Sequence, residues 1–414
     1  MEVKPGYKQT EAGVIPEEWE VKALRSVLTK GRLGGNYPNQ DRATEYPLMK
    51  MGNLARGYMD TANVEYITQG VTPERQHKLT SGDVLFNTRN TLALVGKVAI
   101  WRDELPIAYY NSNLMRLEFD SQQVCSNVYA NAALNTSGAI AVLRGLATGT
   151  TSVAAIYTRD LMGMPFITPP LSEQRAIAEA LSDVDALLGA LDRLIAKKRD
   201  LKQAAMQQFL TGQTRLPGFH GEWEVKRLGE LAEMGSGGTP PSSVPAYYDG
   251  DIPWVSISDM TKGGKIILST DRNLTREGFT NSAAQMFPVG TVLYAMYASL
   301  GECSIAGISL CSSQAILGIR PKDKLNGEFL YYFLTWLKPT VKTLGQHGTQ
   351  ANLNKRMVQD FRLSLPPLPE QTAIAGVLGE MDAELAALEQ RREKTRDLKQ
   401  GMMQELLTGR TRLL

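Results

Sequence analysis

The fold is decided by a stretch that occurs twice, PPLSEQRAIAEALSDVDALLGALDRLIAKKRDLKQAAMQQFLTGQTRL at residues 169–216 and PPLPEQTAIAGVLGEMDAELAALEQRREKTRDLKQGMMQELLTGRTRL at residues 366–413. About 28 of the 48 aligned positions are identical without a gap, against a chance level of roughly one in fifteen. The two stretches therefore arose by duplication, and the chain consists of two related halves.

Each copy predicts one long amphipathic helix. Apolar residues recur in alternating steps of three and four, which is the a and d seam of a coiled coil. The seam comprises Ile177, Leu181, Val184, Leu188, Leu191 and Ile195 in the first copy, and Ile374, Leu378, Met381, Leu385 and Leu388 in the second. After a charged interruption we expect the second stripe to resume at Leu398, Met402 and Leu406.

Local residues predict where each helix begins and ends. A double proline precedes Ser172-Glu173-Gln174 in one copy and Pro369-Glu370-Gln371 in the other; proline is tolerated in a first turn, and the carboxylates complement the positive end of the helix dipole. Gly212 and Gly409 suit the left-handed position that ends a helix. The 39 residues from Ser172 to Leu210 would form a rod roughly 58 Å long.

A seam of that length needs a partner, and the matching seam of the other copy is the natural one. Because a globular block separates the two copies, the simplest pairing is antiparallel. The alternative is that each helix packs only on its own block, but the seam is longer than a block of this size usually covers.

A second, shorter repeat marks the start of each half. Residues 18–22 and residues 222–226 both read Glu-Trp-Glu-Val-Lys. In mid-chain the Thr-Gly-Gln-Thr-Arg-Leu tail runs into Pro217-Gly218-Phe219 and then this element, whereas the equivalent tail stops at the C-terminus and the N-terminus supplies the element again. The sequence therefore reads as circular, which predicts neighbouring termini and an approximate twofold axis relating the halves.

A diverged block of about 150 residues lies between the Trp and the double proline of each half. Short β-branched and aromatic runs alternate there with Gly, Pro and Asn turns, which is typical of a mainly β core with some helices. We expect a first domain at 1–168, a central spacer helix at 169–212, a second domain at 213–365 and a C-terminal spacer helix at 366–414. The predicted fold class is α+β: two mixed α/β domains, related by a pseudo-twofold axis and separated by an antiparallel pair of long coiled-coil helices.

Composition excludes several classes of protein. The chain has 414 residues, 43% of them hydrophobic, and a formal net charge of only +2, so neither disorder nor a strongly basic surface is indicated. Three cysteines without a CxxC pair and three histidines leave no disulfide framework and no zinc site, which favours a reducing compartment. No targeting segment or run of about 20 apolar residues is present, so we expect a soluble, cytoplasmic protein.

Turns rich in amides, hydroxyls and arginine are the candidate nucleic-acid contacts, because these side chains read base edges. The candidates are Lys50, Asn53, Asn87, Thr88, Arg89, Asn111, Asn113, Gly149, Thr150 and Thr151 in the first block, and Ser256, Ser258, Asp259, Tyr297, Gln314, His347, Gly348, Thr349 and Gln350 in the second. The alternative for each is a capped turn or a solvated loop, since Asn, Ser and Gly favour turns for local reasons.

Catalytic motifs are missing from the sequence. His347 has no Ser or Cys nucleophile marked by a motif, and we interpret it as a loop or contact residue. Residues 235–239, Gly-Ser-Gly-Gly-Thr, resemble a phosphate loop but lack the Lys that would follow, which favours a tight turn. No metal-binding or cofactor-binding pattern is found, so we expect a chain that is not an enzyme and holds no metal or cofactor.

Taken together, these motifs resemble the DNA specificity subunit of type I restriction-modification enzymes, over essentially the whole chain. The doubled Pro-Pro-Leu-x-Glu-Gln helix with its Leu-Thr-Gly-x-Thr-Arg-Leu tail carries the resemblance. The openings of the blocks are also similar: Gly6-Tyr7-Lys8, Ile15-Pro16-Glu17-Glu18-Trp19, Gly237-Gly238-Thr239-Pro240 and Ile252-Pro253-Trp254. So are Asn87-Thr88-Arg89 with Gly96-Lys97, and Gly149-Thr150-Thr151. The first block departs most, with Leu-Gly-Gly-Asn-Tyr-Pro at 33–38 in place of the fuller turn.

The resemblance implies two target-recognition domains, each reading one half of a bipartite asymmetric sequence in double-stranded DNA, with the helices fixing the gap. It also implies that the helices bind two modification subunits, which carry S-adenosylmethionine and methylate adenine. Restriction subunits would add ATP-driven and Mg²⁺-dependent translocation and cleavage. These cofactors would belong to the partners.

Two other functions stay open from the residues alone. The near-neutral charge also fits a scaffold whose helices assemble a complex and whose blocks bind peptides or glycans. A stand-alone methyltransferase or nuclease is disfavoured by the missing motifs. Whether a restriction partner exists is not encoded in this sequence, since a methylation-only system would use the same subunit.

Overall fold

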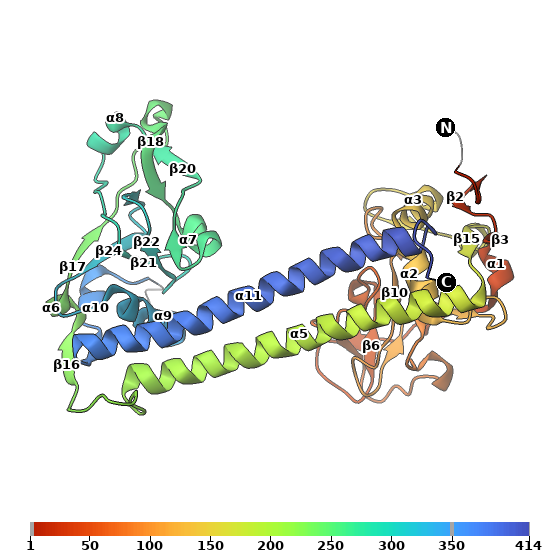
Figure 1. The fold of residues 1–414 in the computed structure, drawn as a ribbon, viewed down its shortest axis with the longest axis horizontal. Helices are drawn as coiled ribbons and strands as arrows, with labels where there is room; N and C mark the ends of the chain where they lie inside the picture. Colours follow the sequence, from red (N-terminus) through yellow and green to blue (C-terminus); the bar gives the residue numbers. More distant parts are fainter. Residues whose placement is uncertain (1–3, 348–351, 414) are drawn as a thin grey trace. The chain divides into compact units, whose positions relative to one another are not determined.

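The computed structural model describes residues 4–347 and 352–413 (Figure 1). The chain forms two compact units, which we call unit 1 (Met1–Leu191 with Arg391–Leu414) and unit 2 (Asp192–Gln390). Each unit contains one mixed α/β domain and one half of each of two long helices. This α+β architecture of two domains and a long helix pair confirms the predicted fold class. The predicted twofold axis and the four-part division of the chain stay predictions.

The two long helices coincide with the duplicated stretches. Helix α5 (Leu171–Thr211, yellow-green in Figure 1) has 41 residues, and α11 (Leu368–Leu406, blue) has 39. Each begins directly after the double proline with a glutamate in its first turn. Gly212 and Gly409 follow with φ of 71° and 69°, a backbone conformation that favours glycine and ends a helix.

Within each unit the two helix halves run antiparallel. In unit 1, Asp185 of α5 lies against Lys399 of α11, with 2.5 Å between Oδ1 and Nζ. In unit 2, Lys202 of α5 pairs with Asp382 of α11. Because Lys202 and Asp382 are the repeat equivalents of Lys399 and Asp185, the duplicated sequence makes the same ion pair twice. The predicted antiparallel pairing is thereby confirmed within both units.

The same two aspartates also hold the domains against the helices. Asp185 accepts a hydrogen bond from Nη2 of Arg102 at 2.7 Å, and Asp382 accepts one from the Tyr332 hydroxyl at 2.7 Å. Burial and the neighbouring Asp382 carboxylate raise the pKa of Tyr332, so its hydroxyl stays protonated and donates. Each aspartate is therefore shared by its own helix, the opposite helix and a domain.

The seam of each helix packs both against the other helix and against a domain, the two alternatives considered from the sequence. Buried seam residues are Ile177, Leu181, Leu191, Ile195, Ile374, Leu378 and Leu385, and half-buried ones are Val184, Leu188, Met381 and Leu388. In unit 1, Ile177 shares an apolar cluster with Trp19 of the domain and Leu406 of α11. In unit 2, Ile374 clusters with Leu210 of α5 and with Phe329 of the domain. Each seam thus packs on the partner helix and on its own domain.

The expected continuation of the second stripe is wrong at Leu398. This side chain is 59% exposed, whereas Thr395 is 8% exposed and occupies the seam. Thr395 lies seven residues after Leu388 and seven before Met402, so the heptad continues through the charged interruption without a shift. The stripe does include Leu406, which is buried.

In each unit a buried glutamate accepts hydrogen bonds from a Trp and an Arg that come from distant segments of the chain. Glu173 at the start of α5 accepts hydrogen bonds from Trp19 Nε1 at 2.9 Å and from Arg412 of the C-terminal tail. We call this trio the tail lock of unit 1. The sequence predicted a helix-dipole role for Glu173, but the side chain is fully buried, so its main role is to accept these bonds.

Unit 2 has an equivalent tail lock, built by the tail that follows α5. Arg215 binds Glu370 in a bidentate geometry, at 2.5 Å and 2.7 Å, and Trp223 Nε1 donates to Glu370 at 3.2 Å. The guanidinium of Arg215 also lies over the Trp223 ring, 5.3 Å from its centroid. Each long helix therefore fastens, through its own tail, the domain at the start of the other helix.

The glutamine of each repeat motif fixes the loop ahead of a domain helix. Gln174 donates to the carbonyls of Pro169 and Gln123 and accepts from Cys125 N–H, at 2.9 to 3.1 Å. Gln371 makes the equivalent bonds with Pro366, Lys324 and Asn326, at 2.8 to 2.9 Å. Both side chains are fully buried, which explains why the motif reads Glu-Gln in both copies.

The domain of unit 1, called domain 1, has three sheets of three or four strands and two strand pairs, β1-β2 and β15-β3. Its main antiparallel sheet has the order β10-β8-β12-β4, a second has the order β11-β6-β7-β5, and a ribbon has the order β13-β14-β9. Its strands are β1 (Tyr7–Thr10), β2 (Gly13–Pro16), β3 (Glu20–Ala23), β4 (Leu28–Leu33), β5 (Asn39–Gln40), β6 (Pro47–Met49), β7 (Glu65–Ile67), β8 (Val84–Asn87), β9 (Arg89–Asn90), β10 (Val98–Ile100), β11 (Tyr109–Tyr110), β12 (Leu114–Phe119), β13 (Thr148–Gly149), β14 (Ala154–Ala155) and β15 (Pro165–Thr168). Its helices are α1 (Leu24–Val27), α2 (Asn127–Leu134), α3 (Ser137–Leu146) and α4 (Thr158–Met162), with 3-10 turns at Met51–Asn53 and Arg75–His77.

The domain of unit 2, called domain 2, has two larger sheets in the orders β17-β24-β21-β22-β19 and β20-β18-β23. Its strands are β16 (Glu224–Arg227), β17 (Ala232–Ser236), β18 (Tyr248–Val255), β19 (Ile266–Ile267), β20 (Arg272–Leu274), β21 (Val292–Ala295), β22 (Cys303–Ala306), β23 (Cys311–Ser312), β24 (Ile316–Pro321) and β25 (Arg362–Leu365). Its helices are α6 (Leu228–Leu231), α7 (Ile257–Gly263), α8 (Arg276–Thr280), α9 (Gly327–His347) and α10 (Lys355–Gln359), with a 3-10 turn at Pro245–Tyr247. In both domains the strand after the repeated Trp pairs with the strand before the double proline: β3 with β15, and β16 with β25.

The described ends of the chain meet in unit 1. The Tyr7 hydroxyl donates to the carbonyl of Gly409 at 2.8 Å, and Arg412 forms an ion pair with Glu18 at 3.0 Å. The prediction of neighbouring termini is therefore confirmed.

Candidate nucleic-acid interface

Two predicted contact segments of domain 1, and the stretch that follows a third, meet at Thr88. Its N–H and its hydroxyl both donate to the carbonyl of Asn113, at 3.0 Å and 2.8 Å. Its own carbonyl accepts from the N–H of Ile156 at 3.0 Å. We call this meeting point the junction of domain 1. It joins the ends of β8 and β12 to the segment that follows the Thr148–Thr151 turn.

The ribbon β13-β14-β9 carries the exposed part of this junction. Ala155 of β14 pairs with both Thr148 and Arg89 in register. Arg89, Gly149, Thr150 and Thr151 are all exposed. Gly149 has a φ of 129°, and a Cβ there would lie 2.4 Å from the Val153 carbonyl oxygen, so the turn requires glycine.

Other predicted residues of domain 1 have structural roles. Asn53 and Asn87 are 5% and 0% exposed. Asn53 donates to the carbonyls of Asp60 and Asn63 and accepts from Lys50 N–H, and Asn87 bridges its own loop. Asn111 is 9% exposed and caps the turn to Asn113. The ammonium group of Lys50 pairs with Glu65 at 2.8 Å. Of the remaining predicted residues, Thr88 and Asn113 are half-buried, and Arg89 and the Gly149–Thr151 turn are exposed.

Domain 2 has an equivalent junction at Met296. Its N–H donates to the Ala315 carbonyl at 2.9 Å, and its carbonyl accepts from Leu353 N–H at 3.0 Å. The strand repeat aligns Met296 with Thr88, and Tyr297 with Arg89. Tyr297 is 39% exposed. The predicted residues Gly348, Thr349 and Gln350 lie outside the described residues, and His347 is the last residue of α9.

The remaining predicted residues of domain 2 form two groups. Ser256 and Asp259 make a capping box on α7, in which Asp259 is buried and also accepts from Asp271 N–H at 2.7 Å. Ser258, next to them, is exposed. Gln314 is exposed and accepts a hydrogen bond from the Thr239 hydroxyl. Ser258, Tyr297 and Gln314 are thus the predicted residues that reach the surface in the described part of domain 2.

A double glycine packs against each junction. Gly34 donates to Leu114 O and Gly237 donates to Ile316 O, both at 3.1 Å. A Cβ would lie 2.2 Å from the Tyr110 carbonyl oxygen at Gly34 and 2.2 Å from the Ser312 carbonyl oxygen at Gly237. The glycines at 237 and 238 therefore serve close backbone approach rather than the tight turn predicted for residues 235–239. The first block, which departs in sequence, keeps the same backbone arrangement.

Burial shifts the pKa values of three titratable side chains near the junctions. Burial raises the pKa of the Cys311 thiol on β23 to about 12, and burial raises the pKa of Tyr110 to about 12. Burial also lowers the pKa of His77, whose Nδ1 lies 2.6 Å from the Tyr37 hydroxyl. At neutral pH all three groups are uncharged. Over residues 4–347 and 352–413, no three His, Cys, Asp or Glu side chains gather as a metal site would require.

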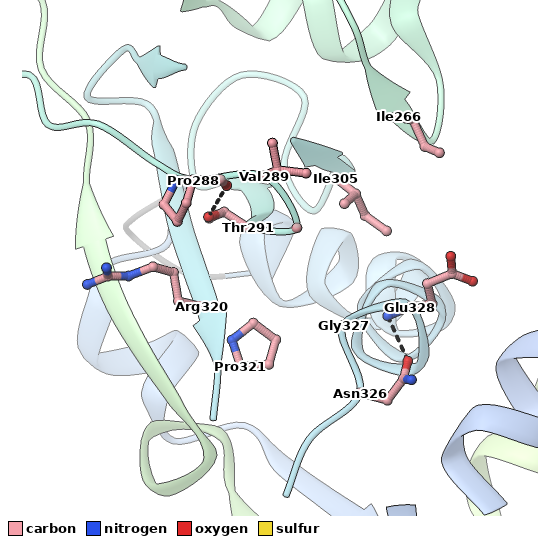
Figure 2. Close-up of a pocket in the computed structure, with 11 residues that line it drawn as sticks. Ile266, Pro288, Val289, Thr291, Ile305, Arg320, Pro321, Asn326, Gly327 and Glu328 are labelled. Atoms are coloured by element: carbon pink, nitrogen blue, oxygen red, sulfur yellow. Dashed lines mark hydrogen bonds between the residues drawn. The ribbon is translucent and has the colours of Figure 1, made fainter. Parts of the chain in front are cut away.

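A shallow hollow of about 560 Å³ in domain 2 is separate in its lining from the predicted contacts (Figure 2). The Thr291 hydroxyl donates to the Pro288 carbonyl at 2.7 Å, and the Glu328 N–H donates to the Asn326 side chain at 2.9 Å. These two hydrogen bonds stabilise a turn and the first turn of α9. None of the predicted contact residues lines the hollow, so it is not part of the candidate interface. No helix in the described part of the chain is long and apolar enough to cross a membrane.

Sequence reasoning missed the contacts of the tail locks and two arginines close to the junctions. Trp19, Trp223, Arg215 and Arg412 of the tail locks stood in the repeats, but repetition alone did not reveal that they meet. Their signal was that a Trp and an Arg accompany each Glu-Gln motif in both copies. Arg159 and Arg356, close in sequence to the two junctions, were also passed over, although they too are equivalent in the repeat.

Comparisons with known proteins agree on one family. The family model for the type I restriction modification DNA specificity domain matches residues 16–197 and 220–395. A putative type I restriction enzyme MjaX specificity subunit from Methanocaldococcus jannaschii is 26% identical over 98% of this chain and 97% of its own length. The EcoR124I/EcoR124II specificity subunit from Escherichia coli is 23% identical over 39% of this chain and 41% of its own length.

Solved structures share the fold. A chain from a study of the complex assembly and conformational transition of a type I restriction-modification system matches with a TM-score of 0.59 and 19% identity, over 95% of this chain and 99% of that one. The S subunit of a type I restriction-modification system from M. genitalium matches with a TM-score of 0.58 and 15% identity, over 98% of both chains.

Proposed function

Because the chain belongs to the family of type I restriction-modification DNA specificity subunits, we propose that each domain binds one half of a bipartite, asymmetric DNA target. The observation that carries this proposal is the duplicated junction. Both domains bring the same three segments together around Thr88 and Met296, yet the exposed side chains around the two junctions differ. Two unlike readers on one chain recognise two unlike half-sites, which makes the target asymmetric.

The long helices set the gap between the half-sites in this proposal. A helix of 41 residues is about 60 Å long, and two readers on such a rod reach one face of a duplex at half-sites about 34 Å apart. The shared aspartates and the tail locks support this role, because they tie each domain to both helices through buried or half-buried polar bonds. A domain so fastened keeps its position on the helix pair.

Partner subunits supply the chemistry in this proposal. The family resemblance assigns two modification subunits, with S-adenosylmethionine, to the helices and adjoining faces. It assigns restriction subunits, with ATP and Mg²⁺, to the same complex. We propose that this chain contributes recognition and no catalytic step, which is supported by the lack of a catalytic motif in the sequence. A role on intracellular DNA would place the complex in the cytoplasm.

A band-shift assay with the modification subunit present tests the proposal. The expected result is a shift on DNA that contains one specific bipartite sequence, and a much weaker shift on DNA without it. No shift on any DNA would favour a scaffold that binds peptides or glycans. Binding of S-adenosylmethionine to the purified chain alone would favour a stand-alone methyltransferase.

A further inference from the structure

Comparison of the two junctions separates side chains that the duplication kept from side chains that diverged. Arg159 in α4 and Arg356 in α10 are repeat equivalents, 197 residues apart, and both are arginine. Each lies three residues after the N–H that closes its junction, which belongs to Ile156 in domain 1 and Leu353 in domain 2. The two junctions therefore present an arginine at the same place.

Neither arginine is needed to hold its domain together. The side chain of Arg159 is 91% exposed, and among the described residues it pairs only with the adjacent Asp160, at 3.2 Å. Arg356 is exposed, and within residues 4–347 and 352–413 its guanidinium makes no hydrogen bond or ion pair. An exposed ion pair such as Arg159–Asp160 contributes little to stability. Folding therefore does not explain why both copies carry arginine here.

The position next to the junction residue is different in the two copies. Arg89 follows Thr88, and Tyr297 follows Met296. Both side chains are exposed, and the guanidinium of Arg89 has no hydrogen-bonding partner among the described residues. Arginine and tyrosine present different hydrogen-bonding groups, so the two junctions offer unlike chemistry at one equivalent position.

The surface around Arg89 has the character of a contact face. Along residues 153–157 the side chains alternate, with Ala154 and Ile156 buried while Val153 and Tyr157 are 61% and 60% exposed. Ala155, between the exposed pair, lies in register with Arg89. A cation, a β-branched apolar group and an aromatic ring are therefore uncovered together, and these groups suit base edges and thymine methyls.

We propose that Arg159 and Arg356 contact DNA phosphates beside the two junctions, while Arg89 and Tyr297 read bases in the first and second half-site respectively. This division of roles rests on the proposed function. A phosphate is chemically the same at every base pair, so a phosphate contact can stay identical in both copies. Base edges differ between half-sites, so the reading position must diverge.

Salt-dependent binding of the complex with its modification subunit tests the phosphate contacts. Each of Arg159→Ala and Arg356→Ala is expected to lower the slope of log affinity against log salt by about 0.9. Between 50 and 200 mM salt, each variant then loses roughly threefold less affinity than the unmodified complex. The recognised sequence is expected to stay the same. Arg410→Ala, an exposed arginine of the C-terminal tail that pairs with Glu405 at the surface, is the matched control and should leave the slope unchanged.

Methylation sequencing of cells that express the complex tests the two readers. Arg89→Ala is expected to relax one base position in one half-site, by roughly 5- to 150-fold in preference. Tyr297→Ala is expected to change only the other half-site. Each variant thus serves as the control for the other, because the unaffected half-site reports that the protein is folded and assembled.

Three outcomes would overturn the proposal. One is an unchanged salt slope in both arginine variants. Another is a change in both half-sites from a single reader variant. The third is loss of the modification subunit from the complex with the DNA preference unaltered, which would make this face a protein-binding surface. The proposed function fails separately, and only if the unmodified complex itself recognises no bipartite sequence.

Discussion

Removal of Arg412 tests how the tail locks hold the molecule together. Glu173 is fully buried, and Arg412 and Trp19 are its two side-chain donors. Arg412→Ala leaves a buried carboxylate with only the indole N–H as a side-chain donor. Loss of one partner of a buried ion pair costs about 3–5 kcal/mol. Because the Arg412 side chain is 30% exposed, water offsets part of this cost, and we expect a loss of about 2–4 kcal/mol.

Hydrogen exchange measured segment by segment is the appropriate assay, because the chain has two units and need not unfold in one step. Amides of the β3 and β15 pair, which join domain 1 to the start of α5, should exchange roughly 30- to 1000-fold faster in Arg412→Ala. The equivalent β16 and β25 pair in unit 2 should change little. Arg215→Ala should give the mirror-image result.

A matched control and a rescue sharpen this test. Arg410 is in the same tail but only pairs with Glu405 at 3.5 Å on the surface, so Arg410→Ala should cost less than about 0.5 kcal/mol. Adding Glu173→Gln to Arg412→Ala should recover part of the loss, because a neutral amide is easier to bury than a carboxylate. If Arg412→Ala behaves like Arg410→Ala, the reasoning about the lock is refuted.

Three further predictions concern the domain interiors. Tyr294→Phe should raise stability by about 1–2 kcal/mol in chemical denaturation, because the buried hydroxyl has no hydrogen-bonding partner in the described structure and domain 1 has Phe86 at the equivalent position; a loss of stability would contradict this. Gly237→Ala should cost about 3 kcal/mol or more, because its Cβ would lie 2.2 Å from a carbonyl oxygen, while Gly218→Ala, with open space around it but a φ of 89°, should cost only about 1–2 kcal/mol from backbone strain. Cys311 should resist maleimide at pH 8 until domain 2 unfolds, because burial raises its pKa to about 12 and the reactive thiolate forms only as pH approaches that value; labelling as fast as the half-buried Cys125 would be inconsistent with this burial.

The long helices could be predicted because their signal is local and repeated. The period of the apolar residues, the double proline and the terminal glycine all act within one helix, so one long helix after each double proline could be predicted from the sequence alone. The stripe was misplaced only where Thr395, a polar residue, occupies the seam and Leu398 faces solvent. The hydrophobicity of a single residue does not predict such an exchange, because the register set by the rest of the helix decides which residue faces the seam.

Only some of the predicted contact residues reach the surface, because the sequence does not distinguish an amide that contacts DNA from one that holds a loop. Asn and Gln carry the same groups whether they read a base or hold a loop. Asn53 and Asn87 are buried and hydrogen-bonded to backbone. Arg89, two residues after Asn87, is exposed. Only the fold decides between these outcomes. The glutamate at each helix start was likewise assigned a dipole role, because its donors come from segments up to 239 residues away.

Long-read methylation sequencing of cells that express this chain with its modification subunit tests the central claim most directly. The chain without any substitution or insertion should give one motif with two unlike half-sites and a fixed gap. Four residues inserted after Ile195, and after the equivalent Arg392 in α11, extend the helices by about 6 Å, so the half-sites should stay the same while the gap lengthens by about two base pairs. An unchanged gap, or changed half-sites, would contradict the claim that the helices measure the distance between two independent readers.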